Sequence, residues 1–120
     1  MLVPIKDEAK QLRTCFASIL ALDYPNLQII AIDDRSTDGS GDLLRSFAGR
    51  LPLTVLSEPA KGKNRALNRG IGIAEGDLVV LTDDEIVASV DWLSAWASVA
   101  DRLGEFDIFG GRIVPRWGME

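Results

Sequence analysis

The sequence predicts an α/β fold with a mostly parallel sheet. Short apolar stretches alternate along the chain with stretches in which apolar residues recur at helical spacing. Such an alternation of strands and helices favours a layered structure with right-handed crossovers between parallel strands. The 120 residues, 47% of them hydrophobic, suffice for one domain with a buried core.

The first half of the chain predicts three strands and two helices. Residues 1–4 have the apolar character of the end of a buried strand, and we expect its beginning upstream. Helical spacing of apolar residues predicts a helix over residues 9–20, behind an acidic start. Residues 27–32 predict a strand buried on both faces. After a polar stretch rich in capping residues, residues 43–47 predict a short helix, and residues 53–56 the next strand.

The second half continues the same alternation. Residues 66–74 predict a helical stretch despite two glycines, and residues 78–81 predict a second fully apolar strand. An amphipathic helix follows over residues 92–103, where two tryptophans, a valine and a leucine recur at helical spacing. Residues 108–114 predict a last strand, interrupted by a pair of glycines.

Two of these apolar strands end in consecutive carboxylates. Asp33 and Asp34 follow one strand, and Asp83, Asp84 and Glu85 follow the other. Ligands of an open parallel sheet bind beyond the carboxyl ends of the strands, so both clusters should face one crevice. Five carboxylates repel each other unless a cation joins them. Mg²⁺ or Mn²⁺ prefers oxygen ligands and completes its shell with phosphates and water, so the implied ligand is phosphorylated.

The basic residues between the two clusters fit the same interpretation. Lys61, Lys63 and Arg65 lie where a strand gives way to a helix, and a diphosphate can meet side chains and helix N–H groups there. The alternative is that these charges form a solvated face and that the acids only cap turns and helices. Repetition of the acids at two equivalent strand ends favours the ligand site.

Composition excludes several other classes of function. The chain has no histidine, which rules out Ser-His-Asp and Cys-His catalysis. Cys15 is the one cysteine, so neither an ordinary zinc site nor an internal disulfide can form. The net charge of -5 disfavours binding to duplex nucleic acid. No apolar run approaches the roughly 20 residues that cross a bilayer, and the glycines match neither a P-loop nor a G-x-G-x-x-G fingerprint.

Short motifs in a characteristic order run along nearly the whole chain. They are VPIKDE (3–8), residues 12–20, YPNL (24–27), IAIDDRSTDGS (30–40), KNRALNRG (63–70), AEGD (74–77), LTDDE (81–85) and DWL (91–93). Together they resemble the N-terminal part of the family 2 glycosyltransferases. The resemblance implies the GT-A fold, a Rossmann-like three-layer α/β/α arrangement that is truncated here on its C-terminal side.

The resemblance also assigns roles to individual residues. Pro4 and Glu8 match the loop after the first strand, which borders the nucleotide. Asp33 and Asp34 match aspartates that contact the base and ribose of a nucleoside diphosphate. Lys63 lies in a segment near the base and the diphosphate.

The acidic triplet falls on the D-x-D motif of the family. The resemblance implies nucleotide binding by Asp83 and Asp84, and binding of Mg²⁺ or Mn²⁺ by Asp83 and Glu85. Glu85 stands where the family has an aspartate and is one methylene longer, which displaces the ion and makes Asp83 the safer assignment.

The implied reaction is an inverting sugar transfer. The donor would be a UDP-, GDP- or dTDP-sugar and the acceptor a glycan or lipid-linked hydroxyl, as in polysaccharide or cell-envelope biosynthesis. In the family the catalytic base lies well downstream of the D-x-D motif, so we assign none. We therefore expect residues 1–120 to be a single incomplete domain, the donor-nucleotide half, inactive alone and prone to self-association through exposed apolar surface.

Two other functions remain open at this stage. A non-catalytic module could keep the fold for assembly or regulation, with the acids retained as caps. A nucleotidyltransferase of similar architecture would need a Gly- and Arg-rich loop after the first strand, and the sequence there does not supply one. We expect a cytoplasmic location, with attachment to the inner face of the membrane through missing segments or partners as the alternative.

Overall fold

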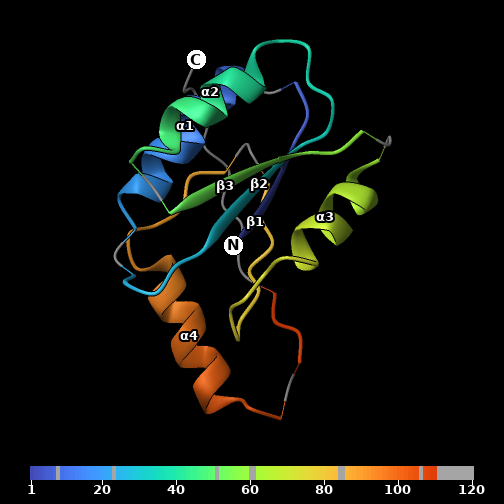
Figure 1. The fold of residues 1–120 in the computed structure, drawn as a ribbon. Coiled ribbons are helices and arrows are strands. Elements are labelled where there is room, and N and C mark those ends of the chain that lie inside the picture. Colours follow the sequence, from blue (N-terminus) through green and yellow to red (C-terminus); the bar gives the residue numbers. More distant parts are fainter. Residues whose placement is uncertain are drawn as a thin grey trace.

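Three parallel strands form the centre of the molecule, in the order β1-β2-β3 (Figure 1). β1 comprises Leu2–Ile5, β2 Ile29–Asp33 and β3 Leu53–Ser57. The parallel pairing confirms the predicted fold class. The computed structural model describes residues 1–7, 9–22, 24–50, 52–59, 62–83, 86–105 and 107–110.

Every residue of β1 and β2 is buried. Successive side chains of a strand point to opposite faces of the sheet. Val3 and Ile5 of β1 accordingly join a core cluster on one face, whereas Leu2 joins a second cluster on the other. Burial on both faces explains why these segments are continuous apolar runs rather than alternating ones.

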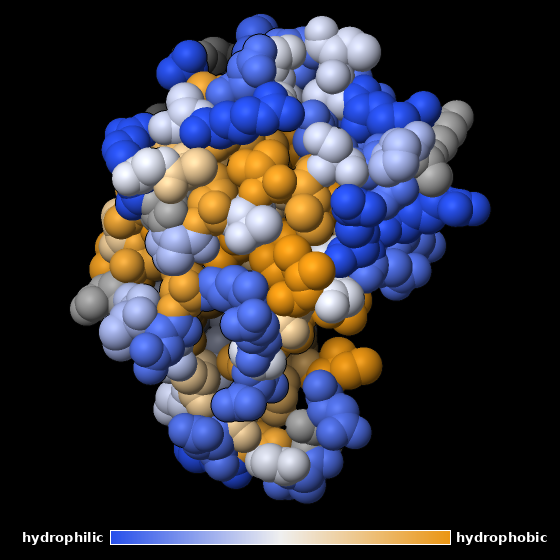
Figure 2. Space-filling model, viewed as in Figure 1, coloured by the Kyte–Doolittle hydropathy of each residue, from blue (hydrophilic) through white to orange (hydrophobic). Residues whose placement is uncertain are grey.

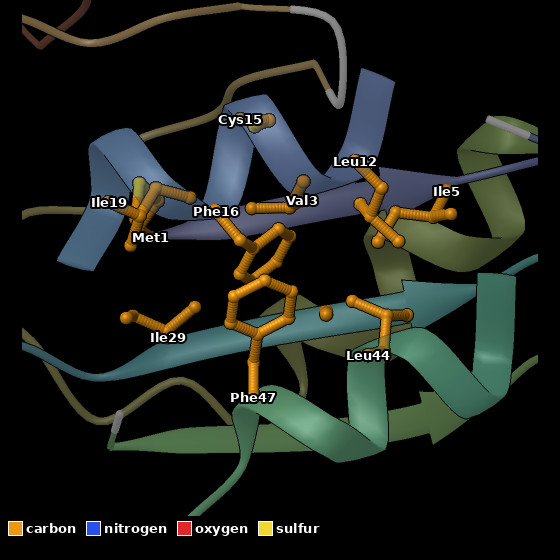
Figure 3. Packing of buried hydrophobic residues seen from close by; sticks show 11 residues of the cluster. Met1, Val3, Ile5, Leu12, Cys15, Phe16, Ile19, Ile29, Leu44 and Phe47 are labelled. Atoms are coloured by element: carbon orange, nitrogen blue, oxygen red, sulfur yellow. The ribbon is translucent and has the colours of Figure 1, made fainter. Parts of the chain in front are cut away.

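Helices α1 (Ala9–Leu20) and α2 (Ser40–Phe47) cover the first of these faces. Their apolar sides meet over the sheet, where the rings of Phe16 and Phe47 lie with centroids 5.4 Å apart. Figure 3 shows the two rings between α1 and α2, with Leu12, Ile19 and Leu44 around them.

Helix α3 (Lys63–Ile71) covers the opposite face, which completes the three layers. Its Ala66 is fully buried against Leu2, Ile30 and Ile32. Helix α4 (Trp92–Arg102) lies at the bottom of Figure 1, at the end of the molecule away from α2.

The helical stretch predicted over residues 66–74 was too long, because α3 ends at Ile71. Beyond that point the backbone tightens, and the amides of Ile73 and Ala74 bond to carbonyls three residues earlier. At Gly70, α3 packs so closely on the sheet that no side chain would fit there without a shift of its neighbours. A Cβ atom at Gly70 would lie 2.9 Å from Cδ1 of Ile32.

The strand predicted over residues 78–81 is the main correction. The segment forms one parallel bridge, between Leu81 and Leu2, with hydrogen bonds from Leu2 N to Val80 O (2.8 Å) and from Thr82 N to Leu2 O (3.1 Å). It therefore runs beside β1 in the parallel sense, but it is not fully buried, and Leu81 is 55% exposed. Within the described ranges, no further strand pairs with its outer edge.

The last predicted strand falls partly outside the described residues. Residues 108–110 are not in a strand, and Ile108 is exposed. Residues 111–114 lie outside the described part of the chain. Among the helices of the described ranges, none is both long and apolar enough to cross a membrane.

Apolar side chains reach the surface mainly in the second half of the chain. The large exposed ones at the end of α3 and between α3 and α4 are Ile71, Ile73, Leu78, Val79, Leu81, Val87 and Val90. Figure 2 also shows hydrophobic residues in the middle of the face that Figure 1 presents, with hydrophilic residues around them. This surface agrees with the expectation of self-association, which stays a prediction.

The aromatic contact between α1 and α2 provides a test of the core. Phe16→Ala removes a fully buried ring and leaves a cavity beside Phe47, so we expect a loss of about 3–5 kcal/mol in the free energy of unfolding. Urea unfolding followed by circular dichroism measures it. Leu20→Ala, at an exposed position of the same helix, serves as the control and should change stability by less than about 1 kcal/mol. Equal losses for both variants would contradict the assigned core.

Candidate functional site

Buried carboxylates gather at the carboxyl edge of the sheet. Asp33 is the last residue of β2 and Asp34 follows it, and both are nearly buried, at 8% and 9% exposed. Glu58, directly after β3, is also 9% exposed, and its amide donates to the carbonyl of Asp33 at 2.9 Å. The sequence interpretation missed Glu58. The available signal was a single acid at a strand end, the pattern that identified the two aspartates.

The carboxylate of Asp33 is held by the loop that follows β2. Its Oδ1 accepts a hydrogen bond from the amide of Ser36 at 3.0 Å. The helix α2 begins close to the other oxygen, since a Cβ at Gly41 would lie 2.8 Å from Oδ2 of Asp33. Glycine at position 41 therefore leaves room for this carboxylate.

One carboxylate oxygen of Asp34 is buried but accepts no hydrogen bond from the described residues. Among the described residues, its buried Oδ1 receives no hydrogen bond, and Nε of Arg35 lies 3.6 Å away as an ion pair. Its own amide donates to the carbonyl of Ile5 at 2.8 Å, which fixes its place beside the end of β1. A buried carboxylate oxygen in this state favours a ligand that brings a hydroxyl or N–H donor.

The loop after β1 is bonded to the loop after β2. Oδ1 of Asp7 accepts the amide of Thr37 at 2.6 Å, and the amide of Asp7 donates to Oγ of Ser36 at 2.9 Å. Nζ of Lys6 donates to the carbonyl of Arg35 at 2.9 Å. Asp7 and Arg35 both have left-handed backbones, with φ of 49° and 56°, a conformation that these contacts stabilise.

Asp38 extends this connection to the helices. Its Oδ2 accepts the amide of Ala9 at the start of α1 at 3.0 Å, and its Oδ1 accepts the amide of Ser40 at 3.1 Å and the Ser40 hydroxyl. The hydrogen bonds from the Ser40 side chain and from Ala9 hold the pKa of Asp38 below its ordinary value. Asp38 therefore caps the start of α1 and closes the turn before α2.

A salt bridge joins the second carboxylate cluster to α3. Nζ of Lys63, in the first turn of α3, lies 2.8 Å from Oδ1 of Asp83, and both side chains are 60% exposed. The parallel bridge of Leu81 to Leu2 directs the chain toward the same edge that carries Asp33 and Asp34. The structure thus pairs Lys63 with Asp83, and the segment of Asp83 runs toward the edge that carries Asp33 and Asp34.

Other predicted site residues are placed differently or are not described. Pro4 is a buried residue of β1, opposite Ile32, rather than a residue of the following loop. Glu8, Asp84 and Glu85 lie outside the described residues, as does the basic residue at position 61.

The described part of the site offers a divalent cation the right type of ligand atom, a carboxylate oxygen, but not a complete set of protein ligands. Asp83 presents a half-exposed carboxylate, the oxygen type that Mg²⁺ and Mn²⁺ prefer, and Lys63 neutralises it. No cluster of three metal-ligating side chains occurs within the described ranges. One carboxylate together with substrate phosphates and water is a common environment for such ions.

A parallel α/β layer structure with polar groups at the carboxyl edge defines a ligand-binding domain of the doubly wound class. The family model for glycosyl transferase family 2 matches residues 1–118. The chain belongs to this family, which confirms the resemblance seen in the sequence.

Two relatives illustrate the family membership. Glycosyltransferase GlyG of Streptococcus pneumoniae is 38% identical over 90 residues, which cover 72% of this chain and 30% of GlyG. The poly-beta-1,6-N-acetyl-D-glucosamine synthase of Staphylococcus epidermidis is 30% identical over 86 residues, 71% of this chain and 21% of the synthase. The chain thus spans less than a third of the length of these curated relatives.

Solved structures confirm the fold. S. aureus TarS, residues 1–349, superposes with a TM-score of 0.80 at 22% identity, over 96% of this chain and 37% of that TarS fragment. TarS has also been solved with UDP and with UDP-GlcNAc. The mannosyltransferase PcManGT of Pyrobaculum calidifontis, in complex with GDP-Man and Mn²⁺, superposes with a TM-score of 0.78 at 31% identity, over 82% of this chain and 31% of PcManGT.

The lowered pKa of Asp38 predicts a pH-dependent contribution to stability. Because the folded-state pKa lies below the unfolded one, the contribution is complete above the unfolded value of about 4 and is lost as the pH falls through the lowered pKa. We therefore expect Asp38→Asn to be less stable than the wild type at neutral pH, with a difference that shrinks in acid.

Urea unfolding at a series of pH values from neutral to strongly acidic checks this expectation. Asp101→Asn, at an exposed position of α4, controls for the loss of one negative charge. A stability difference between Asp38→Asn and the wild type that stays constant across the series would rule out the assigned role of Asp38.

Proposed function

We propose that this chain binds the nucleoside-diphosphate part of a sugar donor and forms the donor half of a metal-dependent, inverting glycosyltransferase. The observation that carries the proposal is the Lys63–Asp83 ion pair at the edge of the sheet where Asp33 and Asp34 are buried. A nucleotide brings a hydroxyl or N–H donor for Oδ1 of Asp34, which accepts no hydrogen bond from the described residues, and a diphosphate for the lysine.

Each residue has a defined part in binding the donor. Asp33 and Asp34 accept hydrogen bonds from the base and the ribose. Oδ1 of Asp34, which accepts no hydrogen bond from the described residues, is the acceptor already in place for one of them. When the nucleotide enters, the Lys63 ammonium leaves Asp83 and pairs with the diphosphate, which frees the Asp83 carboxylate. Pro4, buried in β1, supports the floor of this edge without offering an N–H group.

Asp83 is the described residue that would hold a divalent cation, and we assign Asp84 and Glu85 to the same site from the D-x-D motif. A bound Mg²⁺ or Mn²⁺ supplies Lewis-acid stabilisation of the departing diphosphate. The structure of PcManGT with GDP-Man and Mn²⁺ supports this choice of ligand and ion. Glu8 remains a proposed neighbour of the nucleotide.

The acceptor and the base belong to the wider proposal. We propose a glycan or lipid-linked hydroxyl as acceptor and a role in polysaccharide or cell-envelope biosynthesis, which the named activity of the S. epidermidis relative supports. The base that deprotonates the acceptor is assigned to segments other than residues 1–120, so we propose that this chain alone binds the donor without transferring the sugar.

Nucleotide titration with and without Mn²⁺ tests the donor site. We expect GDP, UDP or dTDP to bind the 120-residue chain at least about tenfold more tightly with Mn²⁺, because the ion joins the diphosphate to carboxylates. Asp83→Asn should abolish this gain without lowering the metal-free affinity, because the variant leaves Lys63 free for the diphosphate. Isothermal titration calorimetry measures both affinities.

The control for Asp83→Asn is Asp101→Asn, which removes an exposed carboxylate charge from α4. If a folded wild-type sample binds none of the three nucleotides, or binds them equally with and without the ion, the proposed function is wrong and the non-catalytic module is favoured.

Asp34→Asn tests the base and ribose side of the site. Losing a charged acceptor for a nucleotide hydroxyl should weaken nucleotide binding about tenfold or more, since hydrogen bonds to charged groups contribute about 1.5–3 kcal/mol. The loss should appear with and without Mn²⁺, unlike that of Asp83→Asn. Asp42→Asn, an exposed acid in the first turn of α2, is the control, and an affinity loss equal to that of Asp34→Asn would contradict the assignment.

A further inference from the structure

Helix α1 contacts both ends of the segment that begins with the D-x-D motif. Oγ of Ser18 accepts the amide of Ala88 at 3.0 Å, and Sγ of Cys15 points to the carbonyl of Asp83 at 3.8 Å, a sulfur hydrogen bond. These contacts join residues 70 and 68 positions apart in the sequence. Ser18 and Cys15 are three residues apart and so lie on one side of the helix.

The hydroxyl of Ser18 is oriented for this contact. It donates its own proton to the carbonyl of Cys15 at 2.7 Å, so a lone pair is left to accept the Ala88 amide. Serine is a weak helix former, and its position in the last turns of α1 serves neither as an N-cap nor as core packing.

The helix is a rigid support for these contacts. Leu12, Phe16 and Ile19 fix α1 to the sheet through the core, and all three are at most 1% exposed. Cys15 is fully buried and belongs to the same core cluster as Phe16 and Phe47, and Figure 3 shows it on α1 above these two rings. Among the described residues of the segment, Ile86 also packs against the same core cluster.

We propose that Ser18 is a positioning residue, which with Cys15 holds the chain between Asp83 and Ala88 so that the Asp83 carboxylate stands at the carboxyl edge of the sheet. This inference rests on the proposed function, because it concerns the same donor site. Its physical basis is that a metal-binding carboxylate on an exposed segment needs outer contacts to stay in place, and removing such contacts costs about tenfold or more in affinity.

Ser18→Ala is the main test variant. We expect the amide of Ala88 to exchange its hydrogen about tenfold faster, because its acceptor is gone. The gain in nucleotide affinity that Mn²⁺ brings should fall about tenfold, whereas the metal-free affinity should stay unchanged. A merely structural role would lower both affinities together. Ser18→Thr keeps the hydroxyl and should restore the gain.

The matched control is Ser46→Ala. Ser46 makes the same type of bond, from its hydroxyl to the carbonyl of Leu43 three residues earlier, but in α2, and it should change neither readout. Unchanged exchange at Ala88 in Ser18→Ala, or equal losses of affinity with and without Mn²⁺, would overturn the proposal. If the wild type binds no nucleotide, the proposed function fails, and the exchange at Ala88 alone decides whether Ser18 holds the segment.

Discussion

Burial of β1 and β2 on both faces is the constraint from which the rest of the structure follows. Two strands with no polar face can be kept from water only if helices lie on both sides of the sheet, which places α1 and α2 opposite α3. Parallel strands in turn require crossovers, so every strand ends at the same edge. The chain changes from apolar to polar at that edge, and the candidate site lies there.

The edge is organised by hydrogen bonds between loops rather than by packing. Asp7, Ser36 and Asp38 connect the two loops to each other and to the start of α1, so the positions of Asp33 and Asp34 follow from the loops around them. Acids fill two different roles here. Both carboxylate oxygens of Asp38 accept hydrogen bonds from the protein, whereas the buried Oδ1 of Asp34 accepts none from the described residues.

Sequence patterns predicted elements best where burial on both faces leaves a single interpretation. Residues 27–32 are such a case, and β2 is found there. Residues 78–81 have the same apolar composition, yet they form only one bridge and stay half exposed, because a strand also needs a neighbour along its whole edge. Composition reports the tendency to be buried, and pairing depends on chain segments far away in the sequence.

The sequence by itself determined the fold class, the family and the strand ends that carry acids, since these depend on local periodicity and on the order of short motifs. Only the tertiary structure decided which charges meet. Lys63 pairs with Asp83, which is 20 positions away, and Ser18 contacts Ala88, which is 70 positions away. The burial of Glu58 follows from the sheet around it. No local pattern encodes such distances, because they are set by how the helices and strands pack together.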